Sequence, residues 1–149
     1  MSKPVFSIGV FAIILDKDGG VLLCHRRDHD LWNLPGGGLE ENETPEMGIV
    51  REVREETGLD VVVEKITGVY SKKNKNEIVF SFLCRVVGGE LTLNDEADQI
   101  SYFGLENIPE NFSPKQLERL KDYFSDPEKT HYKMQEGKLS IQLIQEGKL

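Results

Sequence analysis

Glu52, Glu55 and Glu56 have the spacing that brings three carboxylates onto one face of a helix, within about 100° of each other. Like charges so placed repel by roughly 0.2–0.5 kcal/mol per pair, and near a helix C-terminus they also face the negative end of the helix dipole. Local rules of stability that are broken in one place suggest a site. Three converging carboxylates form an oxygen-only pocket suited to Mg²⁺ or Mn²⁺. The competing interpretation is a solvated helix face.

The signals that flank these glutamates predict the helix that carries them. Thr44 is a good N-cap, and Pro45 falls at the first helical position, where its missing N–H costs nothing. Gly58 stands where a left-handed residue ends a helix, and Leu59 can make the hydrophobic contact that accompanies such a cap. We therefore predict a helix over residues 45–57. Its apolar side chains spread over the side opposite the glutamates: Met47, Ile49, Val50 and Val53.

The acidic face belongs to a longer pattern that runs from Gly37 to Leu59. Five residues separate Gly37 from Glu43, seven more follow, and the pattern ends on Arg51-Glu52-Val53-Arg54-Glu55-Glu56-Thr57-Gly58-Leu59. This matches every defined position of the signature G-x5-E-x7-R-E-U-x-E-E-x-G-U, where U is aliphatic. The sequence therefore resembles the Nudix hydrolases, which cleave the diphosphate of nucleoside diphosphates linked to another moiety.

The resemblance implies roles for single residues of the pattern. Glu52, Glu55 and Glu56 match the metal-binding glutamates, and so they are the expected metal ligands and catalytic residues. The carbonyl of Gly36 is implied as a further ligand. It lies in a run of three glycines that would let the backbone pass close to the metal.

The resemblance also implies a structural brace, made of Gly37, Glu43 and Arg51. Glu43 and Arg51 match a salt-bridged pair that holds the glycine loop against the helix. From the residues alone, an ordinary i, i+4 surface pair between Arg51 and Glu55 is about equally compatible.

Two further candidates lie outside the pattern. Glu96 precedes the expected strand 100–103, where many Nudix enzymes are similar in placing a carboxylate that serves as general base or extra ligand. An acidic solvated turn is the alternative interpretation. Arg26 and Arg27 leave an expected strand toward the glycine loop, and we expect them to bind substrate phosphate.

The resemblance implies a metal-dependent hydrolase with Mg²⁺ as its cofactor and Mn²⁺ as a substitute. It would cleave the pyrophosphate linkage of nucleoside diphosphate derivatives, such as nucleoside triphosphates or ADP-ribose-like compounds, by attack of water on phosphorus. The alternatives on the same fold are a non-catalytic nucleotide-binding regulatory module and a prenyl-diphosphate isomerase. The sequence does not select one substrate.

The other elements predict an α/β protein. Residues 5–15 and 21–25 form near-continuous apolar runs, which predict a hairpin-like pair of strands covered on both faces. Ser113-Pro114-Lys115-Gln116 is a capping box that predicts a second helix with Leu120 facing inward. Further strands are expected over residues 61–63, 66–70, 77–87 and 100–103. Helices that cover a mixed sheet on both sides give a Nudix-like α/β/α sandwich, the fold that the resemblance implies.

We divide the chain into a Nudix hydrolase domain, residues 1–134, and a C-terminal extension, residues 135–149. In the extension, Leu139, Ile141 and Leu143 alternate with polar residues, as in a half-buried strand. We expect an added strand that packs on the domain or on a second subunit of a homodimer.

Composition narrows the remaining choices. A chain of 149 residues with 30% charged residues fits one domain with a real core. A net charge of −8 argues against binding duplex nucleic acid but permits a small nucleotide substrate, because divalent ions neutralise phosphate locally. Cys24 and Cys84 sit in apolar runs and are expected to be buried thiols. With no signal peptide and no membrane-spanning run evident, we expect a cytoplasmic protein without membrane contact.

Overall fold

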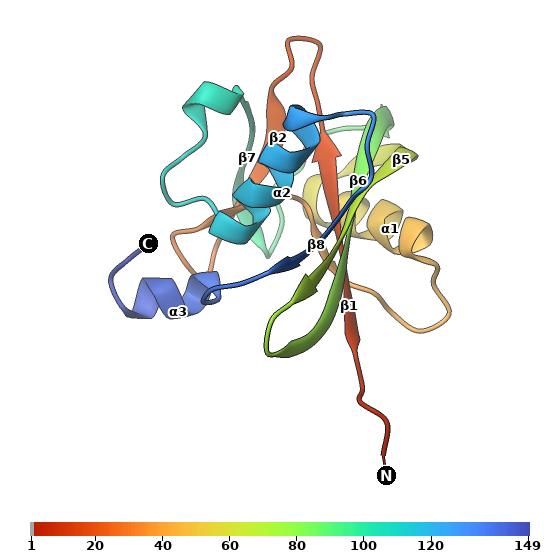
Figure 1. Cartoon of the computed structure of the whole chain (residues 1–149). Helices are drawn as coiled ribbons and strands as arrows, with labels where there is room; N and C mark the ends of the chain where they lie inside the picture. The colour runs from red at the N-terminus through yellow and green to blue at the C-terminus, as the bar shows by residue number, and fades with distance from the viewer. Residues whose placement is uncertain (1) are drawn as a thin grey trace.

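The structure, a computed structural model, describes residues 2–149 and contains two β-sheets with helices packed against them (Figure 1). The strands are β1 (Ser7–Ile14), β2 (Val21–Arg26), β3 (Trp32–Asn33), β4 (Gly36–Gly38), β5 (Leu59–Lys72), β6 (Lys75–Gly89), β7 (Ala97–Phe103) and β8 (His131–Gln135). The helices are α1 (Pro45–Thr57), the 3₁₀ turn η1 (Leu105–Asn107), α2 (Pro114–Ser125) and α3 (Ser140–Gln145). The larger sheet has the order β4-β1-β6-β5-β8, with β1–β6 and β5–β8 parallel, and the smaller sheet has the antiparallel order β3-β2-β7.

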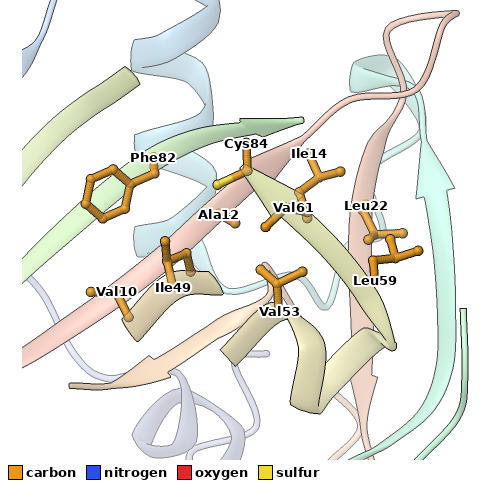
Figure 2. Packing of buried hydrophobic residues seen from close by; sticks show 10 residues of the cluster. All are labelled: Val10, Ala12, Ile14, Leu22, Ile49, Val53, Leu59, Val61, Phe82 and Cys84. Atoms are coloured by element: carbon orange, nitrogen blue, oxygen red, sulfur yellow. The ribbon is translucent and has the colours of Figure 1, made fainter. Parts of the chain in front are cut away.

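Strand β1 lies in the middle of the fold, and its alternating side chains separate two apolar clusters. Ala12 and Ile14 point to one face, where they pack with Ile49 of α1 (Figure 2). Ile13 points to the other face, where it packs with Leu120 of α2. The two helices therefore cover opposite faces of a mixed sheet, and the predicted α/β/α sandwich is confirmed.

Helix α1 has the bounds that its flanking residues predict. The Thr44 hydroxyl accepts a hydrogen bond from the Met47 N–H at 3.2 Å, which caps the first turn. Gly58 adopts a left-handed φ of 81°, and its N–H donates to the carbonyl of Arg54 at 2.9 Å. Since both caps depend on local sequence, the prediction of residues 45–57 is confirmed at both ends.

Only part of the predicted apolar side of α1 is buried. Ile49 and Val53 are fully buried against the sheet, whereas Met47 and Val50 stay exposed. Among residues 2–149, no helix is long and apolar enough to cross a membrane. Both predicted thiols, Cys24 and Cys84, are free and buried.

β5 and β6 form one long antiparallel hairpin, which differs from the shorter strands that the sequence predicts. The predicted strands 61–63 and 66–70 merge into β5, which pairs with β6 along its length through several bulges. Each bulge inserts an extra residue and interrupts the alternation from which the strand limits were predicted. The hairpin turns at Asn74, whose left-handed φ of 62° is one that asparagine tolerates.

The predicted hairpin between residues 5–15 and 21–25 is wrong, because the two strands belong to different sheets. β1 pairs with β4 and β6, whereas β2 pairs with β3 and β7. The strands meet at the bridge between Leu15 and Val21, and Asp16 closes the turn by accepting from the Gly20 N–H at 2.8 Å. Both apolar runs are buried on two faces, and such a run does not specify which strand lies beside it.

The second helix begins at Pro114 as predicted, but the predicted capping box does not form. Ser113 makes no capping hydrogen bond from its side chain. The Gln116 side chain instead accepts from the Leu34 N–H at 2.6 Å, which ties α2 to the loop before β4. Leu120 faces the core as predicted and is fully buried.

The strand predicted in the C-terminal extension is also wrong. Leu139 and Leu143 belong to a segment whose regular part is helix α3, which Figure 1 shows set apart from the sheet. Ile144 directly follows Leu143 and breaks the alternation, so that the apolar residues fit the i, i+3 and i+4 spacing of a helix better. The added strand is β8, which ends where the extension was expected to begin. The domain boundary itself and a homodimer stay predictions.

Gln135 attaches β8 to α2. Its side chain is 1% exposed, accepts from Arg119 Nε at 3.0 Å, and donates to the Lys115 carbonyl at 2.8 Å and to Glu118 Oε1 at 2.6 Å. These bonds satisfy polar groups that would otherwise be buried without partners. The strand is therefore held to the domain by a polar side chain as well as by its backbone.

We expect Gln135→Ala to lower the free energy of unfolding by about 1–3 kcal/mol, because it leaves buried polar partners unsatisfied. Urea unfolding followed by circular dichroism measures the loss. Gln145→Ala is the matched control, since Gln145 is exposed in α3 of the same tail. Equal stability of the two variants would contradict the role given to Gln135.

Candidate active site

The glycine strand β4 passes close to α1 because two of its residues have no side chain. A Cβ on Gly37 would lie 2.6 Å from Glu52 Oε1, and a Cβ on Gly36 would lie 2.2 Å from the carbonyl oxygen of Val10. Any larger residue would therefore push β4 away from the helix or from β1. The glycines thus bring the backbone directly against the acidic face.

Arg51 joins β4, the following loop and α1. Its Nε donates to Glu43 Oε2 at 2.6 Å and its Nη2 to Glu43 Oε1 at 3.0 Å, which is the two-pronged geometry of a strong arginine–carboxylate pair. Nη2 also donates to the Gly38 carbonyl at 3.1 Å, and Glu43 Oε1 accepts from the Glu40 N–H at 2.9 Å. The hydrogen bond from Arg51 holds the pKa of Glu43 below its usual value. The structure therefore joins the predicted brace residues Glu43 and Arg51, and Arg51 reaches the glycine strand at Gly38, whereas Gly37 lies against Glu52.

The same guanidinium also contacts two of the predicted metal ligands. Arg51 Nη1 donates to Glu52 Oε1 and to Glu55 Oε2, each at 3.1 Å. The i, i+4 pair with Glu55 and the brace with Glu43, which the sequence left as alternatives, are thus both present. Arg51 offsets part of the repulsion between the carboxylates that surround it.

Glu56 lies on the inner side of the acidic face. It is partly buried, and its Oε2 accepts a hydrogen bond from the Gly36 N–H at 3.1 Å. The pKa of Glu56 is raised to about 8, mainly by burial and in part by the charges of Glu52, Glu96 and Glu55, against the lowering effect of the Gly36 hydrogen bond. Burial also raises the pKa of Glu52, although Arg51 lowers it in part. The carboxylates are thus close enough to oppose each other's ionisation.

This donor set fits a divalent cation. Within residues 2–149, no three acidic, histidine or cysteine side chains stand ready as a metal-binding group, because Arg51 holds Glu52 and Glu55. Mg²⁺ and Mn²⁺ nevertheless prefer hard oxygen donors such as those on this helix face, where Glu56 forms no described salt bridge. Glu52, Glu55 and Glu56 would hold the ion. Gly36 lies beside them, with its N–H directed to Glu56.

A cleft of about 520 Å³ opens beside this acidic face. Its size is that of a typical small-molecule site. Residues of both sheets, α1 and α2 line it: Phe11, Cys24, His25, Arg26, Arg27, Asp28, Asn33, Leu34, Gly36, Gly37, Glu56, Asp95, Glu96, Ala97 and Gln116. The cleft therefore joins the predicted ligand Glu56 to the other predicted candidates.

Arg26 and Arg27 both line the cleft, but their guanidinium groups already have partners. Arg26 donates to Asp28 from Nε at 2.7 Å and from Nη2 at 2.5 Å. Arg27 Nε donates to the carbonyl of Asn94 at 2.7 Å. Arg26 and Arg27 thus place positive charge in the wall, and Arg27 also holds the loop before β7.

Glu96 lies in the wall of the same cleft, on the loop before β7. It is exposed and lines the cleft together with Glu56, and its charge helps to raise the pKa values of Glu52 and Glu56. Four predicted carboxylates from two distant segments therefore share one neighbourhood.

The structure adds cleft residues that the sequence did not single out. His25 lies between two carboxylates, with Nδ1 2.7 Å from Asp98 Oδ1 and Nε2 2.8 Å from Asp30 Oδ1. Burial lowers the pKa of His25, but the hydrogen bonds and charges of Asp30 and Asp98 outweigh it, so that the pKa is raised. Gln116 reaches the cleft from α2. Asp98, which binds His25, and Leu34, which binds Gln116, are distant from them in sequence, so local spacing does not bring these residues together.

A mixed sheet thus lies between two helices, with arginine-braced glutamates close to a cleft. A model of the NUDIX domain matches residues 5–124, and the chain therefore belongs to the Nudix family. The protein is a Nudix-type pyrophosphohydrolase.

The proteins that the chain resembles are named for different activities. It is 35% identical over 137 residues to a MutT-like protein of Streptomyces ambofaciens, covering 92% of this chain and 88% of that one. It is 37% identical over 118 residues to an ADP-ribose pyrophosphatase of Methanocaldococcus jannaschii, covering 74% and 69%. The structure resembles that of a UDP-X diphosphatase, with a TM-score of 0.78, 25% identity and coverage of 89% and 69%.

We expect Glu56→Gln to change how the stability of the metal-free protein depends on pH. The raised pKa of Glu56, about 8 against an ordinary 4.5, favours the folded state at low pH, and this contribution is lost as the pH rises from 4.5 through 8. Glutamine cannot ionise. The melting temperature of the variant should therefore rise relative to that of the wild type between pH 4.5 and 8. Above pH 8 the difference between the two melting temperatures should stay constant.

Thermal unfolding in excess chelator at pH 5, 7 and 9 measures this difference. The pH 5 samples are the internal control, because Glu56 of the folded wild type is then protonated and neutral, as the glutamine of the variant is. A difference that does not change with pH would contradict the environment described for Glu56.

Proposed function

We propose that this enzyme hydrolyses the pyrophosphate linkage of a nucleoside diphosphate derivative, by attack of water on phosphorus, and that it requires Mg²⁺ or Mn²⁺. The observation that carries the proposal is one cleft lined by Glu56 of the acidic helix face, by Glu96 of the loop before β7 and by two arginines. Such a cleft offers a cation site next to positive side chains, which is the charge pattern that a diphosphate needs.

Each group has a distinct part in the proposed reaction. Glu52, Glu55 and Glu56 would hold the divalent ion, which supplies charge neutralisation to the diphosphate and lowers the pKa of water. Glu96 would accept the proton of the attacking water, since it is exposed and faces the same cleft. Arg26 and Arg27 would donate to phosphate oxygens, in exchange for their present partners Asp28 and the Asn94 carbonyl.

The substrate class is a small nucleotide. The cleft is lined both by charged side chains, Glu56 and the arginines, and by the apolar side chains of Phe11 and Leu34, so it can hold a phosphate group and a flat apolar moiety together. The relatives include an ADP-ribose pyrophosphatase and a UDP-X diphosphatase. A panel of ADP-ribose, nucleoside triphosphates and nucleotide sugars, assayed with Mg²⁺, identifies the preferred compound.

A prenyl diphosphate added to this panel tests the isomerase alternative. A prenyl-diphosphate isomerase would convert its substrate without releasing phosphate or a nucleoside monophosphate. Cys24 lines the cleft, but burial and the nearby Glu56 raise its pKa and keep the thiol neutral. Release of nucleoside monophosphate supports the hydrolase, and turnover of a prenyl diphosphate without phosphate release would overturn it.

We expect Glu55→Gln and Glu56→Gln each to lower kcat by roughly 10²-fold or more, because the charge stabilisation that a bound metal gives is worth several kcal/mol. The fold should stay intact in both variants, since removal of one charge relieves repulsion on the acidic face. Steady-state kinetics and circular dichroism measure the two effects.

Glu46→Gln is the matched control, because Glu46 is an exposed glutamate in the first turn of the same helix. It should turn over substrate at the wild-type rate. If both test variants also kept wild-type rates, the assignment of a metal to this helix face would be wrong.

Activity should disappear in excess chelator, return on addition of Mg²⁺ or Mn²⁺, and rise toward alkaline pH. The ligands must be ionised before they bind a cation, and a coordinated water must lose its proton. Initial rates across pH 6–9 at saturating Mg²⁺, with a chelator series beside them, measure both effects. Full activity in chelator would contradict the mechanism.

A further inference from the structure

The segment between β6 and β7, which carries Glu96, has no regular secondary structure and yet is firmly attached to α1. A helix leaves its last carbonyls without partners inside the helix. Here the Thr57 carbonyl accepts from the Thr92 N–H at 2.8 Å, so the segment supplies a partner for the end of α1. From the other side, the Arg27 N–H donates to the carbonyl of Glu96 at 3.1 Å.

Asn94 is the side chain that links these attachments. Its Oδ1 accepts hydrogen bonds from the backbone N–H groups of Glu96 and Ala97, both at 2.9 Å. Its Nδ2 donates to the backbone carbonyl of Glu56. One amide group therefore contacts the backbone of Glu56 on the helix and the backbone of Glu96 on the loop.

This geometry fixes the two residues relative to each other. Asn94 is partly buried, while Glu96 itself is exposed and belongs to a loop that could otherwise move freely. A short turn alone would need only the two bonds that Oδ1 accepts, as asparagine commonly provides. The bond from Nδ2 to the Glu56 carbonyl reaches outside the turn and ties the turn to the helix that carries the acidic face.

We propose that Asn94 is a positioning residue: it holds the carboxylate of Glu96 near Glu52, Glu55 and Glu56 by tying the Glu96 turn to the last turn of α1. The inference rests on the proposed function, in which Glu96 accepts the proton of the attacking water. Asn94 does not itself reach the substrate. Asn94 acts by orienting Glu96. Its removal should therefore lower kcat and leave substrate binding unchanged.

Two variants separate the two halves of the amide. Asn94→Ala removes all four hydrogen bonds of the side chain, including a long one of 3.5 Å from Nδ2 to the Thr92 carbonyl. Asn94→Asp keeps an oxygen for the N–H groups of Glu96 and Ala97 but loses the donor to the Glu56 carbonyl. Both should lower kcat about 10–100-fold, the usual loss when a group that orients a site residue is removed, with KM changed little. Wild-type kcat in Asn94→Asp would overturn the proposal, since the turn alone would then suffice.

A double-mutant comparison shows whether the effect passes through Glu96. In a Glu96→Gln background, Asn94→Ala should lower kcat further by about twofold or less, the scatter expected of independent effects. An equal loss in both backgrounds would show a general structural role and overturn the proposal. So would a wild-type rate for Glu96→Gln, because there would then be no proton acceptor to position.

The matched control in the same loop is Thr92→Ala. The Thr92 hydroxyl donates to the Glu90 carbonyl within the loop at 3.0 Å, and the variant keeps the backbone bond to Thr57. Its kcat should stay at the wild-type value. A loss equal to that of Asn94→Ala would mean that any change in this loop lowers the rate, and would overturn a specific role for Asn94.

Hydrogen exchange of the metal-free protein gives a readout that does not depend on activity. The amides of Glu96 and Ala97 should exchange faster in Asn94→Ala than in the wild type, and should stay protected in Asn94→Asp. Unchanged exchange in Asn94→Ala would overturn the proposal. If wild-type kinetics persisted in both Asn94 variants while Glu56→Gln was inactive, the inference alone would fail. If the wild type cleaved no diphosphate with Mg²⁺, the proposed function would fail.

Discussion

The Arg51 guanidinium is the interaction on which the site depends. It binds Glu43 through two hydrogen bonds, reaches the Gly38 carbonyl, and contacts Glu52 and Glu55. One side chain thus connects the glycine strand, the loop and the acidic face of α1. Without its charge, Glu52 and Glu55 would lose their cationic partner, and the helix would carry an uncompensated cluster of like charges.

The acidic face lowers stability locally, and the surrounding fold offsets the cost. Ile49 and Val53 anchor α1 in a fully buried cluster, and the caps at Thr44 and Gly58 fix both ends of the helix. A rigid helix can hold carboxylates in a poor electrostatic environment, as the raised pKa of Glu56 shows. Residues that lower local stability and have shifted pKa values are expected at functional sites.

The cleft exists because the two sheets separate after β1. β1 remains in the larger sheet, whereas β2 continues into the smaller one, and residues from both sheets then face the same space. α1 closes one side of that space and α2 reaches it through Gln116. The tail contributes in another way, since Gln135 holds β8 against α2 and supports the face opposite α1.

The sequence by itself determined the elements whose signals are local. The caps at Thr44 and Gly58 set the bounds of α1, and the spacing of Glu52, Glu55 and Glu56 placed them on one face, because a helix is built from contacts three or four residues apart. Only the tertiary structure decided which strands pair, and with them the contacts of Arg27, His25 and Asn94. Apolar runs buried on both faces carry no information about their neighbours, and for this reason the predicted hairpin of β1 and β2 is wrong. The predicted strand in the tail is wrong because Ile144 breaks the alternation of apolar and polar residues. Partners that lie far apart in sequence are selected by packing of the whole chain, and no local pattern records that choice.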